Sequence, residues 1–208
     1  MNSYKPRRPA QLKPDQIELI EGSADIAEAS ELAHTTADVV VPLPGRPPLD
    51  VGVRERVQAL LESEGIDTLA ESWVAMPAES LPGALWRGYL LREWIRRFPS
   101  EAAARFAAAR AASDARALDL ATAQLVHTPA AVKALWDQVF AGGFAGDFHE
   151  VLRESARLTN FLGSVIPGWI GDDAHPLATA VTRRDTAMLR TAAEFEQAEA
   201  LLAAKLLH

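Results

Sequence analysis

From residue 50 onward, apolar positions recur at helical spacing and alternate with residues that begin or end helices. Asp50 is placed to cap the first helix and Gly65 to end it, and its apolar positions are Val53, Val57, Leu60 and Leu61. The same pattern predicts six further helices, over 67–76, 80–98, 101–125, 129–140, 147–166 and 176–207. The helix over 80–98 is apolar around more than half of its circumference, which is typical of a central helix.

Residues 1–49 differ from the rest of the chain. They contain Val39–Val41, the only strand-like run in the sequence, and end in a connector rich in proline. We therefore expect an N-terminal arm and connector over 1–49 and an all-α domain over 50–208. The predicted fold is a single helical bundle of about six or seven helices with a proline-rich, partly extended N-terminal arm.

Composition places the chain among ordinary globular proteins. Its 208 residues are 49% hydrophobic and 24% charged, with a net charge of -7 and no cysteine. The absence of cysteine excludes disulfide scaffolds and thiolate chemistry. No apolar run approaches the roughly 18 residues of a membrane span, and no signal peptide is readable, so we expect a cytoplasmic protein without membrane contact.

Histidine and carboxylate residues give a weak pattern for metal or acid–base chemistry. No two histidines have the spacing that places two metal ligands on one helix face. A site would have to combine Asp147 and His149 with three residues of the loop before the last helix, namely Asp172, Asp173 and His175. Asp147 is also explained as a helix cap, and the two loop aspartates as turn residues. We expect no metal and no cofactor, and treat an enzyme or ligand-binding bundle at these residues as an alternative function.

An arginine-rich stretch stands out in this acidic chain. Residues 87–116 contain seven arginines against three acidic residues. Guanidinium groups suit phosphates and carboxylates, so this stretch predicts a surface for an acidic partner such as nucleic acid or a nucleic-acid enzyme. Pairing at i, i+4, as between Glu93 and Arg97, is the alternative explanation. The arginines that such local pairing leaves over are Arg87, Arg92, Arg96 and Arg116.

The last predicted helix has an apolar stripe that repeats every seven residues. At 1.5 Å per residue it would be about 48 Å long, more than its own domain needs. The stripe consists of Val181, Met188, Phe195 and Leu202. The function predicted first is therefore a non-enzymatic helical interaction or adaptor protein that forms homo-oligomers through this stripe.

Overall fold

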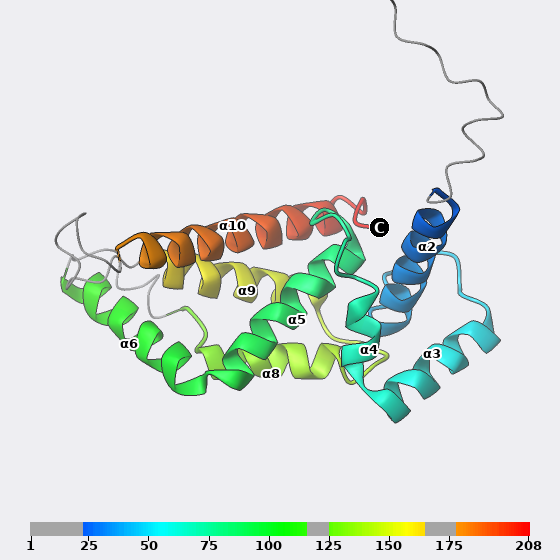
Figure 1. The fold of residues 1–208 in the computed structure, drawn as a ribbon, viewed down its shortest axis with the longest axis horizontal. Coiled ribbons are helices and arrows are strands. Elements are labelled where there is room, and N and C mark those ends of the chain that lie inside the picture. The colour runs from blue at the N-terminus through cyan, green and yellow to red at the C-terminus, as the bar shows by residue number, and fades with distance from the viewer. Residues whose placement is uncertain (1–22, 116–124, 165–177) are drawn as a thin grey trace, which may run out of the picture.

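The computed structural model describes residues 23–115, 125–164 and 178–208, and all regular structure in these ranges is helical (Figure 1). The predicted all-α class is confirmed. Within the described ranges, seven helices fall between residues 50 and 208, and an eighth comes from the predicted arm. The helices are α2 (Ser23–Val40), α3 (Val51–Glu64), α4 (Ile66–Glu71), α5 (Leu81–Arg97), α6 (Pro99–Ala115), α8 (Pro129–Val139), α9 (Phe148–Gly163) and α10 (Ala178–Ala203).

The strand-like interpretation of Val39–Val41 is wrong. Val39 and Val40 form the last turn of α2, and Val41 follows directly after it. All three side chains are buried in the common core together with Ala33 and Ala37. Burial against the other helices therefore outweighs the preference of β-branched residues for strands. The described part of the predicted arm therefore packs on the bundle through α2.

Helix α5 crosses the middle of the bundle and contacts α2, α8 and α10 (Figure 1). Its backbone approaches α8 closely, because a Cβ atom built on Gly88 would lie 2.2 Å from the ring of Trp136. Phe140 stacks on both Trp73 and Trp136, and the Trp136 ring lies 6.0 Å from that of Phe195. These aromatic contacts join the turn after α4, helix α8 and helix α10 into one core.

Helices α9 and α10 lie side by side along one edge of the molecule (Figure 1). Helix α10 has 26 residues and ends at Ala203, four residues before the predicted end. Its end has the hydrogen bonds of a Schellman motif, from Leu206 N to Leu201 O (2.8 Å) and from Lys205 N to Leu202 O (3.0 Å). In this motif Lys205 occupies the left-handed position, with φ of 60°.

Helix α4 is shorter than the helix predicted over 67–76. It begins at Ile66 and ends at Glu71, and turns follow it at residues 72–75. No helix of the described ranges is long and apolar enough to cross a membrane.

Candidate functional site

Three of the four arginines predicted to bind an acidic partner are paired with carboxylates of their own chain. Arg87 Nε lies 2.7 Å from Glu194 Oε2 of α10, and Arg92 Nε lies 2.7 Å from Asp137 Oδ1 of α8. Arg96 binds Glu93 on the same helix. The pairs of Arg87 and Arg92 fasten α5 to α10 and α8, so structural pairing explains these arginines. Arg116 lies outside the described residues.

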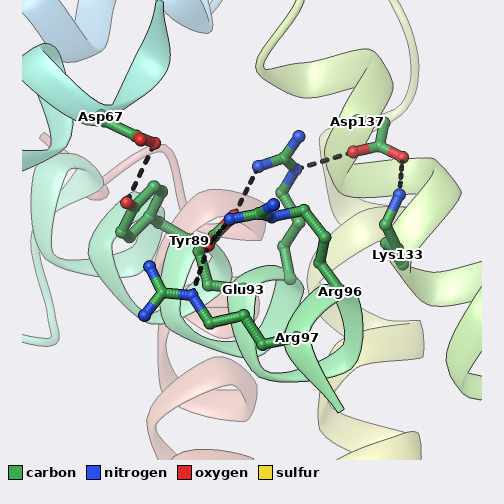
Figure 2. A network of polar contacts seen from close by, with 8 residues as sticks. Asp67, Tyr89, Glu93, Arg96, Arg97, Lys133 and Asp137 are labelled. Atoms are coloured by element: carbon green, nitrogen blue, oxygen red, sulfur yellow. Dashed lines mark hydrogen bonds and ion pairs between the residues drawn. The ribbon is translucent and has the colours of Figure 1, made fainter. Parts of the chain in front are cut away.

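Glu93 is the centre of this arginine network (Figure 2). Its side chain is only 7% exposed, and it accepts four hydrogen bonds of 2.7–3.1 Å from three arginines. The hydrogen bonds of Arg96 lower the pKa of Glu93 despite the opposing effect of desolvation. The donors are Arg92, Arg96 and Arg97. The predicted pairing of Glu93 with Arg97 is confirmed.

Asp137 extends the network to α8 (Figure 2). It accepts hydrogen bonds from Arg92 and from Lys133, the latter at 2.5 Å. Burial raises the pKa of Asp137, but these two hydrogen bonds more than offset it and the pKa is lowered overall. A hollow of about 530 Å³ adjoins these three side chains. Since its basic groups Arg92 and Lys133 are already bonded to Asp137, an anion there would have to displace that carboxylate. Docking of an acidic partner stays a prediction.

The apolar stripe predicted as an oligomer interface faces largely into the protein's own bundle. Phe195 is fully buried against Trp136, while Met188 and Leu202 are partly buried. The side chain of Val181 lies outside the described residues. Placing Phe195 in an interface is therefore wrong, because its ring fills the core beside α9. Self-association through other residues of α10 stays a prediction.

The predicted metal or acid–base residues are only partly brought together. Asp147 caps α9 by accepting a hydrogen bond from His149 N at 2.9 Å. His149 Nδ1 lies 3.3 Å from Glu199 Oε1 of α10. Within the described ranges, no group of three histidine or acidic side chains is placed to hold a metal ion. The loop residues Asp172, Asp173 and His175 lie outside those ranges.

Asp147 and His149 also line a cleft of about 520 Å³. Its walls come from three segments far apart in the sequence: the connector after α2 (41–46), the loop and first turn at the start of α9 (144–149), and the end of α10 with the residues that follow (202–208). Most of the wall is apolar. The larger apolar side chains of the wall are those of Val41, Pro42, Leu43, Pro44, Phe144, Phe148, Leu202 and Leu207.

Hydrogen bonds tie the walls of this cleft to each other and to the core. Phe144 N donates to Val40 O at 3.0 Å, which joins the loop before α9 to the end of α2. Arg46 Nη2 donates to Leu207 O at 2.9 Å, and Arg46 also pairs with Asp38. The amide of Leu81 donates to the carbonyl of His208 at 2.8 Å. The three wall segments are therefore held in place without a ligand.

Arg46 is the most shielded charged group of the cleft. Burial lowers the pKa of its guanidinium. Its pairing with Asp38 and its bond to Leu207 O keep the charge compensated. Arg46 therefore serves to join the connector to the residues after α10.

Sequence reasoning identified Asp147 and His149 but missed the cleft that they line. Glu199 lies 50 residues after His149, and Arg46 lies 161 residues before Leu207. No local spacing connects residues so far apart. The only signals present in the sequence were the prolines of the connector and the glycines of the loop before α9, both of which mark segments that turn.

Comparison with known proteins found no matching family model, no matching curated protein and no matching solved structure.

Proposed function

We propose that the protein binds a small, largely apolar molecule in the cleft between the connector after α2, the start of α9 and the end of α10. The observation that carries the proposal is a preformed cleft of about 520 Å³ with mainly apolar walls and few polar groups. Small-molecule sites typically occupy about 300–1,000 Å³ and have this composition.

The hydrogen bonds that fix the walls of the cleft support a binding site and not an incidental surface depression. Each wall segment bonds to another part of the chain through a backbone group, as in the contact of Phe144 N with Val40 O. Phe148 and Leu207 are 5% and 4% exposed, so the base of the cleft is continuous with the core. A site that is already shaped loses little conformational entropy when a ligand enters.

The hollow beside the arginine network is a weaker candidate. Its volume is similar, but it is lined by Arg92, Lys133 and Asp137, which are already bonded to each other. A ligand there would have to break existing charge-assisted hydrogen bonds before making its own. The apolar cleft demands no such exchange.

The test is a fluorescence titration with phenylnaphthylamine, a neutral dye that brightens in apolar surroundings. Leu43 and Leu202 lie on different walls of the cleft, so Leu43→Trp and Leu202→Trp should each fill part of it. Leu32→Trp is the matched control, because Leu32 is 55% exposed on α2 and lies outside the cleft.

Wild type and Leu32→Trp should bind the dye saturably with one site. Each filling variant that keeps the helical circular dichroism of the wild type should bind at least tenfold more weakly. The proposal is overturned if the wild type shows no saturable binding. It is equally overturned if the filling variants bind as well as the control does.

A further inference from the structure

The charges around the cleft are unlike those of the whole chain. The chain carries a net charge of -7, yet the lining contains the basic residues Arg46 and Lys205 and a single acid, Asp147. Asp147 is committed to capping α9 through its bond to His149 N. His149 and His208 also line the cleft. Basic side chains therefore outnumber acidic ones in the lining, whereas acidic residues outnumber basic ones in the whole chain.

Within the described ranges, Lys205 is a cation of the lining that forms no ion pair. Arg46 is compensated by Asp38, and His149 lies beside Glu199. Lys205 is exposed, and no carboxylate of the described ranges lies within ion-pair distance of it. Its ammonium group is thus available to a ligand in the cleft.

The backbone position of Lys205 supports a role for its side chain. Lys205 has φ of 60° at the left-handed position of the Schellman motif that ends α10. Glycine is the residue that usually occupies this position, because a Cβ atom disfavours the left-handed region. Strained residues of this kind gather at binding sites. A lysine here places an ammonium group at the cleft where stability alone favours glycine.

We infer that the ligand of the cleft is an amphipathic anion, an apolar body carrying one carboxylate or sulfonate group, with the anionic group at Lys205. The inference rests on the proposed function and specifies its ligand class. The apolar body lies along the wall that Leu43, Phe144 and Leu202 provide.

A matched pair of dyes tests this ligand class. Anilinonaphthalene sulfonate has the apolar body of phenylnaphthylamine with one sulfonate added, so comparing the two isolates the effect of the charge. The wild type should bind the sulfonate at least about threefold more tightly than the neutral dye, the range of a single solvent-accessible ion pair. Added salt should reduce only the affinity for the sulfonate.

Lys205→Gly should weaken binding of the sulfonate more than binding of the neutral dye, so that the preference for the sulfonate is lost. This variant should fold at least as stably as the wild type, since glycine tolerates the left-handed position. Lys133→Met is the control for the loss of one positive charge elsewhere, because Lys133 pairs with Asp137 outside the cleft. It should retain the preference.

The outcomes separate the two proposals. If the neutral dye binds in the cleft but the sulfonate binds no more tightly, the anionic ligand class is refuted and the proposed function stands. If Lys205→Gly keeps the preference of the wild type, the anionic group does not lie at Lys205 and the inference fails. If neither dye binds, the proposed function fails as well.

Discussion

Replacing Glu93 by glutamine should destabilise the protein by about 2 kcal/mol at neutral pH. Glutamine keeps the shape of the side chain but removes the charge that attracts three arginines. Arg92 is the most shielded of these donors, at 19% exposed, and a shielded hydrogen bond to a charged group contributes about 1.5–3 kcal/mol. Arg96 and Arg97 are 49% and 61% exposed, so solvent screens their contacts and they add little.

Urea unfolding followed by circular dichroism measures this loss. In thermal unfolding, the same change of about 2 kcal/mol should lower the melting temperature by roughly 4–8 °C in a chain of this size. Glu79→Gln is the matched control, because Glu79 is exposed. It should unfold within about 0.5 kcal/mol of the wild type. A loss below about 0.5 kcal/mol for Glu93→Gln would show that the network contributes nothing to stability.

The effect of Glu93 should also depend on pH in a defined direction. Its pKa is lowered in the folded state, chiefly by the hydrogen bonds of Arg96. The unfolded chain therefore binds the proton more tightly, and the stabilisation is complete above the ordinary glutamate pKa of about 4.3. It is lost as the pH falls through the lowered value. The gap between wild type and Glu93→Gln should thus be constant near neutrality and narrow below about pH 4. A gap that widens in acid would refute the assignment.

Two further substitutions test the packing and the capping of the helices. Gly88→Ala should lower the free energy of unfolding by about 2 kcal/mol, because the new methyl group would lie 2.2 Å from the Trp136 ring. This overpacking outweighs the better helix propensity of alanine. An unchanged urea midpoint would show that α5 and α8 can separate freely. Thr128→Ala should lower the free energy of unfolding by about 1 kcal/mol, because the hydrogen bond that caps Ala131 N is lost. Thr128→Ser should keep most of this stability, since serine can form the same bond. Equal losses in both variants would mean that the cap is not the cause.

Helix boundaries were the part of the fold that the sequence predicted best. The side chains of Asp50 and Asp147 each accept a hydrogen bond from the first turn of the helix that they were predicted to cap. A cap joins residues two or three positions apart, so its signal lies within a short stretch of sequence. The length of α4 was mispredicted because turns at 72–75 replace the expected final helical turn.

Contacts between distant segments could not be predicted in the same way. The pairing of Glu93 with Arg97 follows from i, i+4 spacing, but Arg87 pairs with Glu194 across 107 positions. Arg87 therefore looked unpaired in the sequence although it is bonded in the fold. The cleft escaped prediction for the same reason, since packing of three remote segments creates it.

The hydrogen bond between Phe144 N and Val40 O gives the cleft a natural reporter. This amide belongs to a loop, where backbone protons usually exchange quickly with solvent, yet it is bonded to the buried end of α2. Its deuterium uptake measures how often the loop before α9 separates from α2. Any compound that occupies the neighbouring space should slow that uptake in proportion to its affinity, while amides at the exposed start of α3 keep their rates. Mass spectrometry of a peptide spanning Phe144 would thus detect occupancy of the cleft without a fluorescent dye.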